Sequence, residues 1–289
     1  MSLVNINQIL TQALKKHYAI LHANVISYDM TKAVILAANQ ACAPIIVAVS
    51  EKALQGFADP KDFVLLVKNI LNHYKIKIPV AIHLDHGSYN VVLQAIQSGF
   101  TSVMYDGSKL ALQENLKCTK KIVALAHKKN ISVECEVGTV LGKLEDVNIQ
   151  GQLATVEECK LMAQTGINAL AAGIGNLHGK YPPNWEGLNF QRLQEIHQAL
   201  PNMPLVLHGG SGIPQDQIKK AIKLGVCKFN VGTELMTSFS DALQKYFTGG
   251  GYKQAHGYDP RNYLPLGYQQ IQNTIIEKIK FLGSYNKYK

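Results

Sequence analysis

Eight short apolar runs, rich in β-branched residues, recur roughly every thirty residues along this chain of 289 residues. The segments between them, such as 111–130, place apolar residues at positions i, i+3, i+4 and i+7 with lysines between, which is typical of amphipathic helices. Eightfold alternation of strand and helix predicts an α/β protein whose parallel sheet closes into a (β/α)8 barrel. The predicted strands are 18–27, 43–50, 79–87, 102–108, 132–138, 169–175, 204–210 and 228–234.

An open, doubly wound sheet is the alternative arrangement of the same elements. Against it, no Gly-x-Gly-x-x-Gly motif opens the chain, and polar residues follow nearly every predicted strand rather than one switch point. In a barrel the carboxyl ends of all strands converge on one mouth, where active sites of this fold lie. We therefore expect a single TIM-barrel domain over residues 1–289, with an irregular Gly-, Tyr- and Pro-rich segment at 249–267 and a final helix near 268–282.

Charge and cysteine content limit the partners of the chain. The formal net charge is +9, which suggests attraction to anions, but the lysines are scattered rather than gathered into a tract for nucleic acid. A small phosphorylated substrate suits this charge balance equally well. The five cysteines are dispersed without a Cys-x-x-Cys spacing, as in reduced cytosolic proteins. No stretch approaches the ~18 consecutive apolar residues of a membrane span. We expect a cytoplasmic protein that binds neither nucleic acid nor membrane.

Three histidines, each followed by glycine, come directly after apolar stretches that are typical of buried strands. They are His86, in the run HLDHG, His178 and His208. Three imidazoles at one barrel mouth form the ligand set of a catalytic metal, which keeps one position open for substrate. Imidazole nitrogens favour Zn²⁺, although Co²⁺ and other borderline divalent ions fit the same set.

Carboxylates at neighbouring strand ends are further candidates. Asp85 directly precedes His86, and it either handles a proton or orients a metal-bound histidine. The alternating run VECEV turns Glu136 toward the barrel interior, and Asp106 lies near the end of the fourth predicted strand. A carboxylate inside a barrel is costly unless it is paired or metal-bound. Glu136 and Asp106 are therefore either functional groups or partners of a lysine.

The glycine-rich ends of the seventh and eighth predicted strands indicate an anion site. Gly209, Gly210 and Ser211, together with residues 230–233, supply backbone N–H groups and short hydroxyls where barrels often bind phosphate. Two segments are candidate loops over the mouth. Residues 141–155 lack a strong period, and the tandem prolines in 179–187 forbid a helix.

Seven runs of this sequence resemble motifs of the class II, metal-dependent ketose-bisphosphate aldolases, in order and in approximate spacing. They are HAN (22–24), PVAIHLDHG (79–87), VECEVG (133–138), HG (178–179), VLHGGSGIP (206–214), NVGTE (230–234) and YDPR (258–261). The resemblance covers nearly the whole chain. It implies a glycolytic lyase that reversibly cleaves fructose 1,6-bisphosphate to dihydroxyacetone phosphate and glyceraldehyde 3-phosphate, with zinc stabilising the enediolate.

The resemblance also implies roles for individual residues. His86, His178 and His208 bind the catalytic zinc in this interpretation, and Asp85 exchanges the proton of the aldehyde-derived oxygen. Glu145, on the first mobile loop, moves the carbon-bound proton. The residues implied to hold the substrate are Asn24, Gly179, Gly209, Gly210, Ser211, Asn230, Val231, Gly232, Thr233 and Arg261.

Two implications concern a second ion and a second subunit. Asp106 and Glu136 match positions that hold a second, divalent or monovalent cation in some members of the family. Arg261 matches a residue that reaches the distal phosphate across a subunit boundary. The resemblance therefore implies a homodimer or homotetramer.

This sequence departs from the family pattern at two places. The run VLGKLED (140–146) replaces a run that usually reads like GGxED, so either Glu145 or Asp146 could move the carbon-bound proton. Gly232 stands where fructose-type members often carry asparagine and tagatose-type members alanine. HGGSGIP is closer to fructose-type sequences, which favours that substrate over tagatose 1,6-bisphosphate. A zinc-dependent barrel hydrolase and a non-catalytic basic binding protein are the remaining alternatives.

Overall fold

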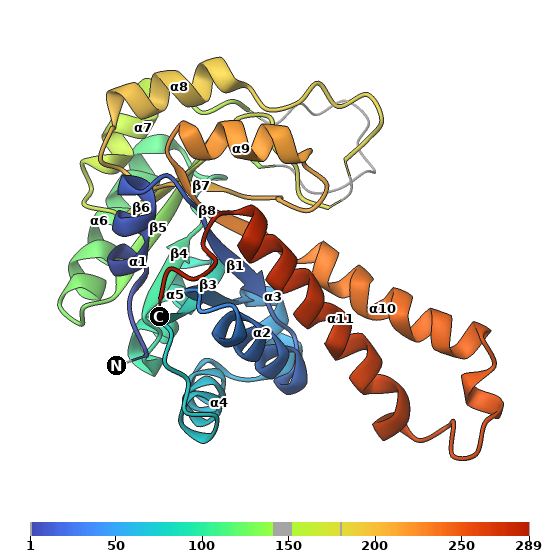
Figure 1. Cartoon of the computed structure of the whole chain (residues 1–289). Coiled ribbons are helices and arrows are strands. Elements are labelled where there is room, and N and C mark those ends of the chain that lie inside the picture. Colours follow the sequence, from blue (N-terminus) through green and yellow to red (C-terminus); the bar gives the residue numbers. More distant parts are fainter. Residues whose placement is uncertain (1, 141–151, 180, 289) are drawn as a thin grey trace.

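The computed structural model describes residues 2–140, 152–179 and 181–288 of the chain. Eight parallel strands form a closed barrel in which neighbours in sequence pair with each other and β1 also pairs with β8 (Figure 1). The predicted (β/α)8 barrel is therefore confirmed. The strands are β1 (Ile20–Asn24), β2 (Ile45–Ser50), β3 (Val80–Gly87), β4 (Ser102–Tyr105), β5 (Ser132–Val137), β6 (Ala169–Ala172), β7 (Leu205–Leu207) and β8 (Val226–Val231).

Helices surround the barrel and alternate with the strands, with two helices between β2 and β3 (Figure 1). In the described parts of the chain, none of these helices combines the length and the hydrophobicity that a membrane span requires. The helices are α1 (Ile6–Lys15), α2 (Tyr28–Gln40), α3 (Glu51–Phe57), α4 (Pro60–His73), α5 (Tyr89–Ser98), α6 (Leu112–His127), α7 (Val156–Ala163), α8 (Phe190–Ala199), α9 (Gln215–Lys223), α10 (Thr233–Thr248), the 3-10 turn η1 (Gly251–Lys253) and α11 (Pro260–Phe281).

Strand side chains are divided between two apolar layers because successive residues of a strand point to opposite faces. In β2, Ile45 and Val47 belong to the large outer layer that packs against the helices, whereas Ile46 belongs to the layer inside the barrel. Burial on both faces explains why the strands read as continuous apolar runs in the sequence.

Helix α1 closes the amino-terminal end of the barrel. Asn5 caps the helix by accepting a hydrogen bond from the backbone N–H of Gln8 at 3.2 Å. The buried face of α1, which includes Ile6 and Leu10, packs against inward-pointing strand residues such as Ile46. This end is filled by apolar side chains, so the opposite, carboxyl-terminal end is left as the open mouth.

The two last helices form a hairpin that extends away from the barrel (Figure 1). The prediction of an irregular segment at 249–267 was wrong in its second half, because α11 begins at Pro260 rather than near residue 268. Asp259 starts the helix by accepting a hydrogen bond from the backbone N–H of Arg261 at 2.9 Å, and proline fits the first helical turn. Helix α11 continues through Pro265, which cannot donate an intrahelical hydrogen bond, and it packs along α10.

Helix α11 should stabilise the barrel through one apolar face. Helix α11 packs against α2 and β1, and its residue Ile275 is fully buried, whereas Leu266 of the same helix is 44% exposed. We predict that Ile275→Ala lowers the free energy of unfolding by about 2–5 kcal/mol, because it leaves a cavity in the core. Leu266→Ala is the matched control, with an expected change within about 0.5 kcal/mol. Urea denaturation measures both, and equal losses in the two variants would contradict this packing.

Candidate active site

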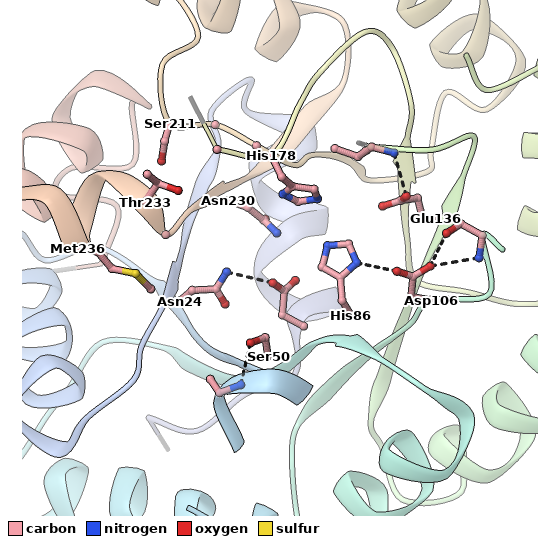
Figure 2. Close-up of a pocket in the computed structure, with 18 of the residues that line it drawn as sticks. Asn24, Ser50, His86, Asp106, Glu136, His178, Ser211, Asn230, Thr233 and Met236 are labelled. Atoms are coloured by element: carbon pink, nitrogen blue, oxygen red, sulfur yellow. Dashed lines mark hydrogen bonds and ion pairs between the residues drawn. The ribbon is translucent and has the colours of Figure 1, made fainter. Parts of the chain in front are cut away.

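A cavity of about 690 Å³ lies at the mouth of the barrel, which is the size of a site for a small molecule. Figure 2 shows polar side chains from several strand ends pointing into it. Asn24 comes from β1, Ser50 from β2, and Asn230 from β8. The candidate residues that line the cavity are Asn24, Asp85, His86, Asp106, Glu136, His178, Gly179, Gly209, Gly210, Ser211, Asn230, Gly232 and Thr233.

The end of β3 turns two consecutive side chains toward this cavity. In a regular strand Asp85 and His86 would point to opposite faces. The pairing of β3 with β4 shifts register between Leu84 and Gly87, and His86 has a φ of 49°, which is rare for a residue with a side chain. This bulge lets Asp85 and His86 both line the mouth. Alternation alone, as applied to the sequence, does not account for this arrangement.

Asp85 is buried, and only one of its two carboxylate oxygens has a hydrogen-bond partner among the described residues. Its Oδ2 accepts a hydrogen bond from the Asn24 side-chain amide at 3.0 Å, while Oδ1 has no hydrogen-bond partner among the described residues. Burial opposes ionisation, but the charges of His86 and of the other nearby histidines and Lys228 together outweigh it and hold the pKa of Asp85 well below its usual value. Asn24 therefore fixes an ionised carboxylate whose second oxygen is free to accept a proton from a bound molecule.

The three candidate histidines meet in space although β6 and β7 end far from β3 in the sequence. One ring nitrogen from each of His86, His178 and His208 lies within 4.8 Å of the others. Asn176 holds the loop after β6 in place, because its buried side chain donates to the His208 carbonyl at 3.1 Å and accepts from the Ile174 N–H at 3.0 Å.

Carboxylates engage the outer nitrogens of two of these rings. His86 Nδ1 lies 2.9 Å from Asp106 Oδ2, and His208 Nε2 lies 3.0 Å from Glu134 Oε1. Because an ionised carboxylate only accepts hydrogen bonds, these contacts place the protons on the outer nitrogens and fix the tautomers. The inner nitrogens, His86 Nε2 and His208 Nδ1, then face each other as acceptors at 3.1 Å. Two lone pairs this close repel each other, and either a proton shared between the two nitrogens or a bound cation relieves the repulsion.

The electrostatics of the three rings also suit a cation. Burial favours the neutral form of the His86 ring. The Asp85 charge and the Asp106 hydrogen bond favour the charged form, and they raise the pKa of His86 to about 9. Burial and the neighbouring His86 charge lower the pKa of His178 to about 4 and that of His208 well below its usual value. In a shared tetrahedral zinc site, nitrogens at bonds of 2.0–2.1 Å lie about 3.3 Å apart. The residues present therefore fit a bound zinc ion.

Comparison with known proteins agrees with this geometry. Residues 4–287 match the family model described as fructose-bisphosphate aldolase class-II. The chain is 48% identical to the fructose-bisphosphate aldolase of Mycoplasma genitalium, with 99% of each protein covered, and 42% identical to that of Streptococcus pyogenes, with 99% of this chain and 100% of the relative covered. It belongs to the class II fructose-bisphosphate aldolase family. Among solved structures, the YdjI aldolase from Escherichia coli K12 is similar with a TM-score of 0.85 and 31% identity, over 99% of this chain and 100% of that one.

In this aldolase, the two residues predicted to hold a second cation have different surroundings. Both Asp106 oxygens are engaged, Oδ2 by His86 and Oδ1 by the Ser108 hydroxyl at 2.6 Å. Glu136 accepts a hydrogen bond from the Val140 N–H at 3.2 Å, and its Oε2 has no partner in the described part of the chain. Burial, with a smaller contribution from the Asp106 charge, raises the pKa of Glu136 to about 8. Glu136 therefore has the freer carboxylate of the two.

The glycine-rich loop after β7 lies against the start of α10. Gly209 has a φ of 66°, and a side chain there would collide with the Leu177 carbonyl. The Ser211 hydroxyl accepts a hydrogen bond from the Glu234 N–H at 3.2 Å, so it ties this loop to the first turn of α10. The amino terminus of a sixteen-residue helix thus opens into the cavity beside Gly232 and Thr233.

Within the described part of the chain, three predicted site residues do not line the cavity: His208, which is completely buried, Val231 and Arg261. The Val231 side chain is buried in the outer apolar layer, so it can contribute only backbone groups. The Arg261 side chain is 89% exposed in the first turn of α11, where it pairs with Asp259 at 2.6 Å. Glu145 and Asp146 lie outside the described residues.

The segment after His178 is held against the barrel. Tyr181 OH donates to the Gly209 carbonyl at 2.9 Å and accepts from the Leu177 N–H at 3.0 Å, and Trp185 Nε1 donates to the Gly175 carbonyl at 2.7 Å. As the tandem prolines predict, its described residues contain no helix.

Sequence reasoning missed several residues of the site. Ser50, at the end of β2, lines the cavity, and its place at a strand end was an available signal. Lys109 and Met236 line it as well, from segments without such a signal. Lys228 gave no functional signal because it comes early in β8, yet its ammonium lies inside the barrel, 2.9 Å from Glu134 Oε2. Glu134 thus bridges Lys228 and His208 beneath the mouth.

The Lys228–Glu134 pair is completely buried, so breaking it should be costly. We predict that Lys228→Met lowers the free energy of unfolding by about 3–5 kcal/mol, because it leaves an unpaired carboxylate in the barrel. Lys32→Met is the control, since its 2.7 Å pair with Asp29 has side chains 31% and 42% exposed, and the expected loss is below about 1 kcal/mol. Chemical denaturation of both variants tests this. A similar, small loss for both would contradict the assignment of a buried charge pair.

Proposed function

We propose that this protein catalyses the reversible cleavage of fructose 1,6-bisphosphate to dihydroxyacetone phosphate and glyceraldehyde 3-phosphate. Membership of the class II family supports the reaction type, and two of the relatives described above carry the name of this activity. The observation that carries the proposal is the position of Asp85, which lines the cavity beside the three converging histidines and has one carboxylate oxygen without a hydrogen-bond partner among the described residues.

We infer that His86, His178 and His208 hold a zinc ion. Zinc supplies positive charge that polarises a neighbouring carbonyl group and stabilises the negative charge that develops on its oxygen. Asp106 and Glu134 keep two of the rings in the tautomers that offer a lone pair to the ion, and such partners commonly raise metal affinity.

Asp85 is the proposed acid and base for oxygen. In cleavage, the C4 hydroxyl gives its proton to Asp85 as the C3–C4 bond breaks, C4 becomes the aldehyde carbon, and the electron pair stays on C3. Condensation reverses each transfer. The amide of Asn24 holds Asp85 in position through its 3.0 Å hydrogen bond and leaves the reactive oxygen free. A second group must deliver a proton to C3, and we propose Glu145 for this role, with Asp146 as the alternative.

The phosphate of dihydroxyacetone phosphate is proposed to bind between the β7 loop and the start of α10. Gly209, Gly210 and Ser211 provide backbone and hydroxyl groups on one side. Asn230, Gly232 and Thr233 lie on the other, where the positive end of the helix dipole attracts an anion. The backbone of Val231 and of Gly179 completes this proposed site.

We also propose a homodimer or homotetramer in which Arg261 of one copy reaches the distal phosphate bound by another. The projecting hairpin of α10 and α11 (Figure 1) supports this, because the segment between its helices presents the exposed aromatic residues Tyr252 and Tyr258, and the exposed Arg261 does not line the cavity of its own barrel. A second cation is proposed at Glu136, with Asp106 nearby.

The free cysteines are consistent with the cytoplasmic location that we propose.

Asp85→Asn should separate catalysis from metal binding. The variant keeps the shape of the side chain but cannot accept the hydroxyl proton, so we predict that kcat falls by about 10²–10⁴. Zinc content and thermal stability should stay close to those of the wild type. Asp62→Asn, at an exposed position on α4, is the control and should leave kcat unchanged. Wild-type turnover in Asp85→Asn would overturn the proposed role.

Metal removal tests the reaction itself. We predict that the zinc-loaded protein cleaves fructose 1,6-bisphosphate faster than tagatose 1,6-bisphosphate, that a chelator abolishes both activities, and that added zinc restores them. A coupled assay for dihydroxyacetone phosphate measures each rate. Cleavage that survives complete metal removal would contradict the metal site. No cleavage of either sugar by the zinc-loaded protein would instead favour a hydrolase or a non-catalytic binding protein.

A further inference from the structure

A fully buried histidine on β1 belongs neither to the proposed zinc site nor to the lining of the cavity. His22 precedes Asn24 by two residues, so both side chains point into the barrel. Ile20, two residues earlier, packs in the apolar layer inside the barrel. Along the inner face of β1, His22 thus occupies the position between that apolar layer and the mouth.

Hydrogen bonds connect His22 to Asp85 through the amide of Asn24. His22 Nε2 lies 3.2 Å from Asn24 Oδ1. Asn24 Nδ2 donates to Asp85 Oδ2 at 3.0 Å (Figure 2). An amide oxygen only accepts hydrogen bonds and an amide nitrogen only donates them, whereas an ionised carboxylate only accepts. Asn24 must therefore turn its nitrogen toward Asp85 and its oxygen toward His22, and His22 must donate from Nε2.

His22 can donate from Nε2 while its ring stays uncharged. Burial and the Lys228 charge lower the pKa of His22 to about 3, although the Asp85 charge opposes them. A neutral imidazole carries one proton, and His22 Nδ1 has no hydrogen-bond partner among the described residues. A proton on Nδ1 would leave a buried donor unpaired and would set the Nε2 lone pair against the Asn24 oxygen. The tautomer with its proton on Nε2 avoids both costs.

The His22 ring is held in place by a second buried histidine. The rings of His22 and His83 pack edge to face, with centroids 5.3 Å apart and planes at 73°. His83 is itself fully buried, and its Nδ1 lies 2.8 Å from the Ser102 hydroxyl. The N–H of His22 is therefore fixed in position, and it fixes the oxygen of Asn24 in turn.

A second metal site is the competing role for these residues. One ligand atom from each of His22, His83 and Asp85 lies within 4.8 Å of the others. The Lys228 ammonium opposes an ion here, because its positive charge lowers the pKa of both His22 and His83. A cation between these rings would meet the same repulsion. The surroundings therefore favour hydrogen bonding by His22 over metal binding.

We propose that His22 is a positioning residue for proton transfer by Asp85. Its N–H holds the Asn24 amide in the orientation that donates to Asp85 Oδ2, which leaves Oδ1 to accept the hydroxyl proton. This inference rests on the proposed aldolase function and adds to it a residue that acts two hydrogen bonds away from the substrate. Without the His22 N–H, the amide can turn its oxygen toward Asp85, and the repulsion between the oxygens displaces the carboxylate.

Replacement of the His22 ring tests this role. His22→Phe removes the N–H, and we expect kcat for cleavage of fructose 1,6-bisphosphate to fall by about 10–100-fold, since a displacement of about 1 Å can cost about 10²-fold in rate. KM and zinc content should stay close to those of the wild type, because the phosphate and zinc sites are not changed. His22→Gln supplies an amide N–H instead and should recover most of the lost kcat. His197→Phe, on α8 outside the cavity lining, is the matched control and should keep the wild-type kcat.

Thermal unfolding verifies that each variant is folded. If the phenylalanine ring destabilises the barrel, His22→Leu removes the same N–H with a smaller side chain.

A partial reaction separates the positioning of Asp85 from general damage to the site. With dihydroxyacetone phosphate alone, removal and return of the carbon-bound proton in deuterium oxide introduces deuterium into the substrate. This exchange involves no C4 hydroxyl and so needs no proton transfer by Asp85. We expect His22→Phe to exchange deuterium at the wild-type rate while its cleavage rate falls.

A double-mutant cycle tests whether His22 acts through Asn24. Asn24→Ala removes the amide, so the addition of His22→Phe to this variant should cause no further loss of kcat. If the two residues acted independently, their separate losses would multiply.

Four results would overturn the positioning role. They are wild-type kcat in His22→Phe, a His22→Gln variant as slow as His22→Phe, an equal loss of deuterium exchange and cleavage, and a full additional loss of kcat in the Asn24→Ala background. Failure of the proposed function has a different signature. The zinc-loaded wild type would then neither cleave fructose 1,6-bisphosphate nor exchange deuterium into dihydroxyacetone phosphate.

Discussion

The hydrogen bonding of β1 to β8, which closes the barrel, is the constraint on which the rest of the structure depends. Closure removes both sheet edges and directs the carboxyl ends of eight strands toward one mouth. It places Asn24 of β1 near Asn230 of β8, although these residues lie far apart in the sequence. Helix α1 fills the other end with apolar side chains, so the polar groups are concentrated at a single opening.

Beneath that opening, a charged pair is buried where apolar residues would be expected. Lys228 and Glu134 are both inaccessible to solvent, and each compensates for the charge of the other. Glu134 also accepts a hydrogen bond from His208, so the same carboxylate connects the barrel interior to the three histidines. The cost of burying these charges is offset by their pairing, and the pair orients a ring that has to present one particular nitrogen to the cavity.

The barrel and the family could be predicted from the sequence, because strand periodicity and strand-end motifs are local patterns. The α10–α11 hairpin could not, since a segment rich in Gly, Tyr and Pro carries no apolar period and α11 is stabilised by long-range packing on α2. The bulge at His86 could not be predicted from the sequence either, because a register shift depends on the partner strand. The roles of the individual site residues remain proposals for the experiments above.

By itself, the sequence determined the order of strands and helices, the strand ends that carry histidine, carboxylate and glycine, and the family to which the chain belongs. These properties follow from residue spacing, which acts over a few positions along the chain. Only the tertiary structure decided which groups meet. Asp106 contacts His86, Glu134 contacts both His208 and Lys228, and Asn24 contacts Asp85. Such contacts depend on barrel closure and register, which bring residues distant in sequence within a few ångströms.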